Sequence, residues 1–171
     1  RRVVFMNARD VADLGLVVVD NADDVDRLEQ LVPEGRTQDV LVRIIPEVES
    51  STHPHVQTGQ VGSKFGLTIP VAKELIARIE ASPKLSMRGV HAHVGSQIMD
   101  PSELAAAVAP LAELGTFPVY DLGGGLGARY TYDEHPASVA EYVEALLAAA
   151  REHLPAEAEL IIEPGRSMVN G

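Results

Sequence analysis

The feature of this chain that most restricts its fold is a repeated alternation between short, continuously apolar runs and helical patterns. Valine, isoleucine and leucine dominate the runs, and about six of them are expected to be strands, at residues 3–6, 16–20, 40–45, 85–94, 117–122 and 159–163. Strands that are apolar on both faces are typical of a parallel sheet covered by helices. The sequence therefore predicts an α/β fold built from repeated strand–helix units.

Four or five helices are expected between these runs, because apolar residues recur there at spacings of three and four. Pro70 stands at the start of one of them, where proline is tolerated. An alanine-rich helix is expected over residues 101–114 and ends before Gly115. Ser138 is expected to cap a further helix that runs to about His153.

Composition excludes several classes of function. The chain has 171 residues, enough for one domain, and it contains no cysteine, which excludes disulfides, thiolate metal sites and a cysteine nucleophile within it. A formal net charge of −11 makes nucleic acid and anionic membranes poor partners. No run approaches the roughly 18 apolar residues of a membrane-spanning helix, and no signal-peptide pattern is seen. We therefore expect a cytoplasmic protein with a small-molecule ligand.

Three of the predicted strands end in unusual sequence. Each of these strands runs into a polar or glycine-rich segment at its carboxyl end. The segments are HAHVGSQ at residues 91–97, DLGGGLG at 121–127 and EPGRS at 163–167. In parallel α/β folds, ligands gather at the carboxyl ends of the strands. These three segments are therefore expected to form one site on one edge of the sheet.

The glycine run at residues 123–125 has more than one interpretation. Glycine lets the backbone turn sharply and bring bare N–H groups close to an anion, most often a phosphate. A tight turn without any ligand would use the same residues. The run also resembles the first motif of nucleotide-binding Rossmann methyltransferases, but there a helix begins directly after the glycines, and residues 128–136 delay it here.

His91 and His93 point to the same face of a strand, because side chains alternate along it. Hydrogen-bonded core histidines are the ordinary interpretation. A His-x-His pair can also supply two zinc ligands in a barrel hydrolase, but that needs further ligands on later strands. Those strands offer Asp121 and Glu163 and no histidine, so no metal is assigned.

The EPGR segment combines an anion, a rigid turn and a guanidinium. Arg166 can grip a carboxylate or phosphate through two hydrogen bonds. Glu163 can hold a proton on a ring nitrogen, or it can form an ordinary surface ion pair. A phosphate, an aromatic ring facing His93 and a basic ring nitrogen together describe pyridoxal phosphate (PLP).

At this point the motifs resemble those of the fold-type III PLP-dependent decarboxylases, and most closely the diaminopimelate decarboxylases. The segment GVHAHVGSQI at residues 89–98 is similar to that family's G-x-H-x-H-x-G-S-Q-I. The segments at 121–127 and 163–167 match two further motifs, and the polar stretch at 52–66 is similar to its T-H…T-G…K-F-G segment. The resemblance implies decarboxylation of meso-diaminopimelate to L-lysine.

The resemblance also implies the site residues. Those that would contact PLP are His93, Ser96, Gly123, Gly124, Gly125, Glu163, Gly165 and Arg166. His93 would stack on the cofactor ring and Glu163 would pair with its pyridine nitrogen, which makes these two the catalytic residues. The glycine amides would hold the phosphate, and Arg166 would bind phosphate or the substrate carboxylate.

The implied fold is a (β/α)8 barrel of the alanine racemase type, active as a homodimer. A complete barrel takes about 250 residues, so about six strands predict only part of one. Residues 1–171 are therefore expected to be a single, incomplete PLP-binding domain, without the family's C-terminal β domain. The early strand that carries the family's cofactor-binding lysine is not matched either. A non-catalytic PLP- or phosphate-binding half-barrel is the alternative.

Overall fold

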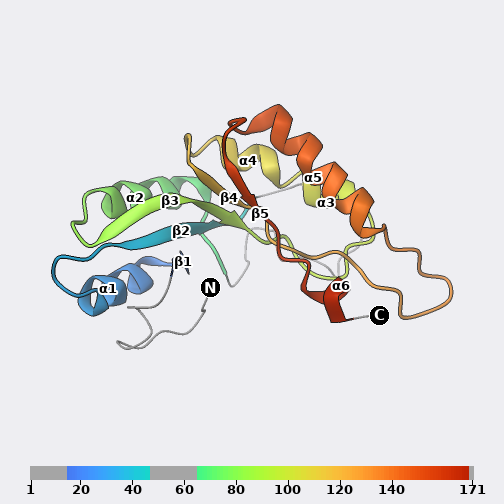
Figure 1. The fold of residues 1–171 in the computed structure, drawn as a ribbon, viewed down its shortest axis with the longest axis horizontal. Coiled ribbons are helices and arrows are strands. Elements are labelled where there is room, and N and C mark those ends of the chain that lie inside the picture. The colour runs from blue at the N-terminus through green and yellow to red at the C-terminus, as the bar shows by residue number, and fades with distance from the viewer. Residues whose placement is uncertain (1–14, 47–64, 170–171) are drawn as a thin grey trace.

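The structure is a computed structural model that describes residues 15–46 and 65–169. Within them, five strands form one parallel sheet in the order β1-β2-β3-β4-β5. The strands are β1 (Leu16–Val19), β2 (Gln38–Ile44), β3 (Leu85–Ala92), β4 (Val119–Asp121) and β5 (Glu159–Ile161). The predicted α/β fold is confirmed (Figure 1). A further predicted strand, at residues 3–6, lies outside the described residues.

Helices separate the strands along the chain. They are α1 (Ala22–Leu31), α2 (Ile69–Glu80), α3 (Pro101–Ala105), α4 (Val108–Ala112), α5 (Val139–His153) and α6 (Gly165–Val169). Polar side chains start several of them: Asn21 accepts a hydrogen bond from the Asp24 amide, and Ser138 forms a capping box with Glu141. Figure 1 shows α1 and α2 beside β1–β3, and α3–α5 beside β4 and β5.

The order of the strands distinguishes between the two folds that the glycine run allowed. In a Rossmann fold the strand order reverses at a switch point, whereas in a (β/α)8 barrel each strand pairs with the next one along the chain. All four pairings in the described part of the chain join consecutive strands. The sheet is therefore part of a singly wound barrel, and it is not closed among the described residues.

The two faces of the sheet differ in chemistry. Val42, Val90 and Tyr120 face the helices and belong to the one hydrophobic core cluster. On the opposite face the register places a polar row, in which Arg43 pairs with His91 and His91 pairs with Asp121. His91 and Asp121 are both buried. The helix-facing side thus supplies stability, and the other side carries ionisable groups near the carboxyl ends of the strands.

One predicted helix is wrong in its length. The single helix expected at residues 101–114 is divided into α3 and α4, with a turn at Ala106 and Ala107. Pro110 explains the break, because it has no N–H to donate to the carbonyl of Ala106 and its ring would collide with that carbonyl. The last helix, α6, was not predicted. No helix within residues 15–46 and 65–169 combines the length and apolar character needed to cross a membrane.

Candidate functional site

A pocket of about 400 Å³ lies where the chain leaves β3, β4 and β5. Its lining consists of His93, Gly95, Ser96, Gly125, Leu126, Tyr130, Glu163, Pro164, Gly165 and Arg166. All three of the motif segments contribute, as expected from the carboxyl ends of parallel strands. Six of the eight predicted site residues are among the lining residues, and Gly123 and Gly124 are not. Its volume is in the range of about 300–1,000 Å³ that small-molecule sites occupy.

Glu163 faces both histidines of β3 and the loop after it. Its Oε2 lies 3.5 Å from Nδ1 of His93 and 3.8 Å from Nε2 of His91. The side chains of His93 and Glu163 are about one-third exposed toward the pocket, whereas that of His91 is buried. The structure therefore brings together the two predicted catalytic residues, His93 and Glu163, and adds His91 behind them.

Arg166 joins a second group of side chains in the pocket. Its Nη2 donates to the Ser96 hydroxyl at 2.7 Å, and its Nη1 donates to the Tyr130 hydroxyl. The guanidinium also lies 5.6 Å from the centre of the Tyr130 ring, in a cation–π contact. These three side chains form a polar cluster that presents hydroxyls and a positive charge to the pocket. A phosphate or a carboxylate is the ligand that such a cluster favours.

Two glycines of the run, Gly123 and Gly124, do not line the pocket, and their amides are occupied. The Gly123 amide donates to Oδ1 of Asp121 at 3.1 Å, and the Gly124 amide donates to Nδ1 of His93 at 3.3 Å. The Gly165 amide likewise donates to the Glu163 carbonyl at 2.8 Å. That these amides hold a phosphate stays a prediction. In this structure the Gly124 amide joins the end of β4 to the loop after β3, and the other two bonds each lie within one strand end.

Gln97 joins the loop after β3 to the loop after β4. Its Nε2 donates to the Ala128 carbonyl at 2.6 Å, and its Oε1 accepts from the Ala128 amide at 3.1 Å. Among the described residues, Gln97 is the only one other than glycine with a positive φ, at 62°. This conformation is uncommon for a residue with a Cβ and costs free energy, which the paired hydrogen bonds offset. Gln97 thereby fixes the loop that carries Ser96.

Tyr142 of α5 supports the glycine loop from below. Its side chain is fully buried, and its hydroxyl donates to the Gly123 carbonyl at 3.2 Å. Burial, with the nearby negative charges of Glu163 and Asp121, raises the pKa of Tyr142 to about 12. Tyr142 therefore remains protonated and donates this bond throughout the physiological pH range.

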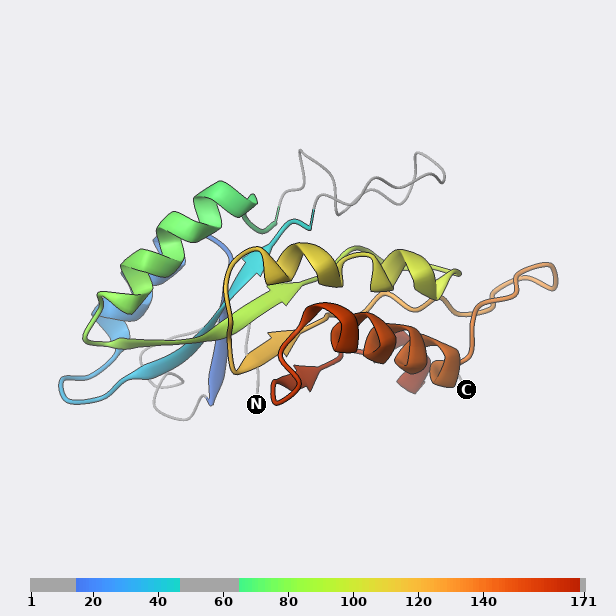
Figure 2. The same ribbon diagram turned by 90° about the horizontal axis from the view of Figure 1, so that it is seen from above.

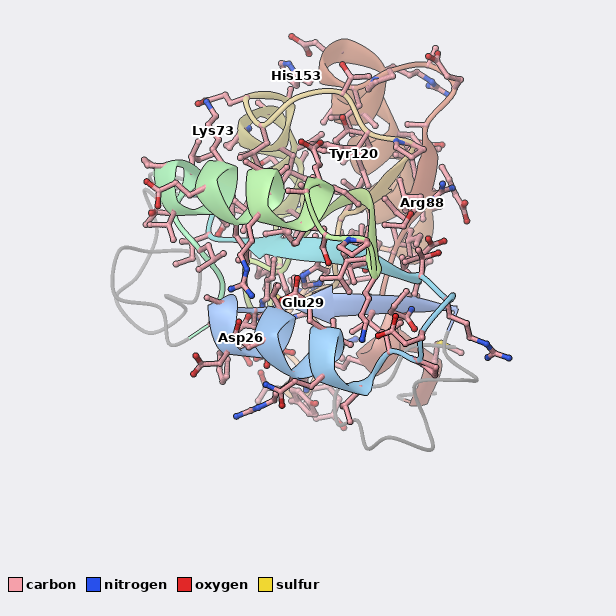
Figure 3. The ribbon with its side chains drawn as sticks, turned by 90° about the vertical axis from the view of Figure 1, so that its left-hand side faces the viewer. Asp26, Glu29, Lys73, Arg88, Tyr120 and His153 are labelled. Carbon is pink, nitrogen blue, oxygen red and sulfur yellow. The ribbon has the colours of Figure 1, made fainter. Side chains whose placement is uncertain are left out.

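The lysines of the described part of the chain, Lys73 and Lys84, lie away from the pocket. Lys73 is exposed on α2, as Figure 3 shows. Lys84 directly precedes β3, at the opposite edge of the sheet, and its Nζ donates to the Glu29 carbonyl at 3.0 Å. Lys64 lies outside the described residues. Neither of the two described lysines can reach a ligand in the pocket.

Comparisons with known proteins now decide between the interpretations of this site. Residues 3–170 match the family model described as "Pyridoxal-dependent decarboxylase, pyridoxal binding domain". The chain belongs to the pyridoxal-dependent decarboxylases. The match covers the pyridoxal-binding domain of that family, which confirms PLP as the predicted cofactor. The donors of the pocket fit this cofactor, since Arg166 suits its phosphate and Glu163 suits its basic ring nitrogen.

Individual members of the pyridoxal-dependent decarboxylases are also similar to this chain. The diaminopimelate decarboxylase of Bacillus subtilis is 38% identical over 91% of this chain and 39% of its own length. That of Mycobacterium leprae is 35% identical over 92% of this chain and 38% of its own length. The chain thus spans about two fifths of the length of these curated relatives.

Solved structures of the family agree with the fold. Diaminopimelate decarboxylase from Helicobacter pylori, complexed with L-lysine, matches with a TM-score of 0.82 and 25% identity, covering 98% of this chain and 45% of that one. The enzyme from M. jannaschii, also in complex with L-lysine, has a TM-score of 0.82 and 27% identity, covering 95% of this chain and 42% of that one. The predicted partial barrel is confirmed.

Sequence reasoning missed three residues of this site. Tyr130 stands in a polar loop without any pattern that marks it, and its partner Arg166 is 36 residues away along the chain. Gln97 was used only to compare the motif with its family, and the bonds to Ala128 could not be foreseen. Tyr142 has the spacing of an ordinary core residue. A tyrosine in the loop that follows a glycine run at a strand end is a signal that could have found Tyr130.

Proposed function

We propose that this chain is the cofactor-binding part of a diaminopimelate decarboxylase, which removes CO₂ from meso-diaminopimelate to give L-lysine. Support comes from the relatives of that name, 33–38% identical over about nine tenths of the chain, and from the two similar structures in complex with L-lysine. The alignment includes every segment that lines the pocket. The substrate assignment rests on these relatives.

The side chains of the pocket divide the work of binding. Arg166 and Ser96 hold an anionic group, either the cofactor phosphate or a substrate carboxylate. Tyr130 orients the guanidinium of Arg166 by accepting a hydrogen bond from it. Glu163 holds a proton on the pyridine nitrogen through its carboxylate, and His93 faces the ring. When bound, PLP supplies an electron sink for the electron pair that remains as CO₂ leaves.

The observation that carries the proposal is the pairing of His93 and Glu163, 3.5 Å apart, in one pocket with Arg166. An anion site and a carboxylate that line the same open space are what a molecule with a phosphate and a protonated ring nitrogen requires. Residues from three strands supply them.

Titration of the chain with PLP, followed by cofactor absorbance, tests the binding. We expect saturable binding that Arg166→Ala weakens by about tenfold or more, since a hydrogen bond to a charged group contributes about 1.5–3 kcal/mol. Arg88→Ala is the matched control, because Arg88 lies on β3 away from the pocket, 3.6 Å from Asp39 (Figure 3). Equal affinity of both variants and the parent chain would disprove the site.

A second test concerns Glu163→Gln in a polypeptide that catalyses the full reaction. Loss of the proton-holding carboxylate should lower the rate of decarboxylation far more than the affinity for PLP. Glu152→Gln is the control, since Glu152 is an exposed residue near the end of α5. Equal losses of rate and affinity would mean that Glu163 only caps the strand.

A non-catalytic PLP-binding half-barrel is the second candidate, and the positions of Lys73 and Lys84 favour it for the chain as given. Borohydride reduction of the PLP-loaded chain, followed by peptide mapping, separates the two. A covalent adduct at a site lysine supports catalysis by the chain itself. Reversible binding without such an adduct supports the half-barrel.

We propose in addition a single, incomplete barrel domain over residues 1–171, a cytoplasmic location and a homodimer. The absence of cysteine from the sequence supports the location, and the family resemblance supports the dimer. In the described sheet, β1 and β5 each pair with a neighbour on one side only, which leaves edges that a second copy could cover. Light scattering during size-exclusion chromatography measures the oligomeric state, and a monomer at every concentration would disprove the dimer.

A further inference from the structure

Three metal-ligating side chains converge beside the pocket. His91, His93 and Glu163 each offer one ligand atom, and these atoms lie within 4.8 Å of one another. Both imidazoles present a nitrogen to the same carboxylate oxygen, Oε2 of Glu163, at 3.8 Å and 3.5 Å. The two rings are nearly parallel, with centroids 6.4 Å apart. The sequence offered His91 and His93 near the end of one strand and Glu163 near the end of another, and the fold brings the three side chains together.

Neither of the contacts with Glu163 is an ordinary hydrogen bond, because N···O distances in such bonds are about 2.7–3.2 Å. Nδ1 of His93 also accepts a hydrogen bond from the Gly124 amide at 3.3 Å, and a metal ion bound at this nitrogen would replace that amide. Nδ1 of His93 and Oε2 of Glu163 lie 3.5 Å apart, so a cation between them would be shared by an imidazole and a carboxylate.

His91 is an unusually placed polar residue. It is 5% exposed, and its Nδ1 has no hydrogen-bond partner among the described residues. The other ring nitrogen, Nε2, has Glu163 at 3.8 Å. The nitrogen that a metal ion would use is Nε2, because this is the atom of the buried ring that faces the Glu163 carboxylate.

The spacing and the donor types indicate which ion fits. Ligand bonds to zinc are about 2.0–2.2 Å long, so two ligands at tetrahedral angles are about 3.3 Å apart. The two nitrogen–oxygen distances to Glu163, 3.5 and 3.8 Å, are close to this value, and all three ligand atoms lie within 4.8 Å of one another, so side-chain rotations must draw them together around an ion. Two imidazoles and one carboxylate suit first-row transition metals, whereas magnesium and calcium prefer oxygen ligands.

We propose that the cofactor-free chain binds one divalent first-row transition-metal ion through His91, His93 and Glu163. Water from the adjoining pocket completes the coordination, because His93 and Glu163 line that pocket. The ion and PLP exclude each other, since both require Glu163 and His93. The proposal does not depend on the proposed function, because the ion is measured without cofactor.

The test is calorimetric titration of the chelator-treated, cofactor-free chain with Zn²⁺, repeated with Co²⁺ to record its visible absorption. We expect one equivalent of bound metal and a Co²⁺ spectrum typical of low coordination number. His93→Asn and Glu163→Gln should each weaken binding by at least about tenfold, because even residues that only orient a ligand contribute about 10–100-fold. Mg²⁺ should bind far more weakly than Zn²⁺.

His153→Asn is the matched control. His153 also lies beside a carboxylate, with Nε2 3.9 Å from Glu152, but at the far end of α5 (Figure 3). This variant should bind Zn²⁺ like the parent chain. Unchanged affinity in His93→Asn and Glu163→Gln, or an equal loss in His153→Asn, would overturn the proposal.

His91→Asn completes the set, with circular dichroism to verify its folding because His91 is buried. If it does not fold, the two pocket-facing variants decide the outcome. A chain that binds Zn²⁺ but no PLP would disprove the proposed function alone, and one that binds PLP but no Zn²⁺ would disprove the metal site alone.

Discussion

The glycines of the site serve two different purposes, which a comparison of Gly124 with Gly165 makes clear. A Cβ at Gly124 would lie 2.1 Å from the backbone oxygen of Glu163, so glycine is required there for two strand ends to meet. A Cβ at Gly165 would have no atom within 4 Å. Gly165 lines the pocket, whereas Gly124 is buried beneath it. A glycine run after a strand can therefore be a packing requirement, while the space for a ligand lies beside another glycine.

The largest expected effect is that of Gly124→Ala. The added methyl group collides with backbone, which cannot rotate away, so the end of β5 must separate from the glycine loop. We expect a loss of about 3 kcal/mol in the free energy of unfolding, measured by urea denaturation. Gly15→Ala is the control, because a Cβ there meets nothing within 4 Å. Equal stability of the two variants would remove the distinction between packing glycines and pocket glycines.

Much of the fold could be predicted from the sequence. A parallel sheet that is covered on both faces requires strands that are almost continuously apolar, and such runs are visible in the sequence. The meeting of His93 and Glu163 could be predicted as well, since the carboxyl ends of parallel strands share one edge. The partners of the glycine amides could not, because Nδ1 of His93 and Oδ1 of Asp121 reach them only through the path of the loops. The break before Pro110 was predictable, since its missing N–H is a local property.

Gln97→Ala tests whether the loops around the glycine run are joined by side chains as well as by close packing. The variant loses both hydrogen bonds to Ala128 and leaves alanine at a positive φ. At about 1 kcal/mol for each bond, we expect a loss of about 2 kcal/mol in stability. Gln97→Gly loses the same bonds but adopts this conformation freely, so it should be the more stable of the two variants. A Gln97→Ala variant more stable than Gln97→Gly would show that the positive φ at residue 97 does not cost free energy.

Tyr142→Phe removes the support beneath Gly123 without changing the packing of the ring. At neutral pH we expect a loss of about 1 kcal/mol, the contribution of one hydrogen bond. The pH dependence is more specific. The pKa of Tyr142 is raised from 10.0 to about 12 in the folded chain, so its contribution to stability is complete below pH 10 and is lost as the pH rises through 12. The decrease in stability that accompanies ionisation of Tyr142 at high pH corresponds to about 3 kcal/mol, and phenylalanine, which does not ionise, does not undergo it.

The variant should therefore lose less stability than the parent chain between pH 10 and pH 12. Some loss should remain, because burial also raises the pKa of Tyr120. Tyr132→Phe is the control, since Tyr132 is 93% exposed in the loop that Figure 2 shows extending from the rest of the chain. Identical alkaline profiles for the parent and Tyr142→Phe would mean that the glycine loop does not depend on this bond.

Gly165→Ala should have the smallest effect on stability and yet a clear effect on binding. No atom meets the new methyl group, so we expect the free energy of unfolding to change by no more than about 0.5 kcal/mol. The methyl group occupies space at the pocket wall beside Arg166, so the affinity for PLP should fall by about tenfold, or about 1.4 kcal/mol. The two quantities are measured on one preparation, by urea denaturation and by cofactor absorbance. A variant that loses stability as Gly124→Ala does, or that binds PLP as tightly as the parent, would show that Gly165 is another packing glycine and that the ligand lies elsewhere.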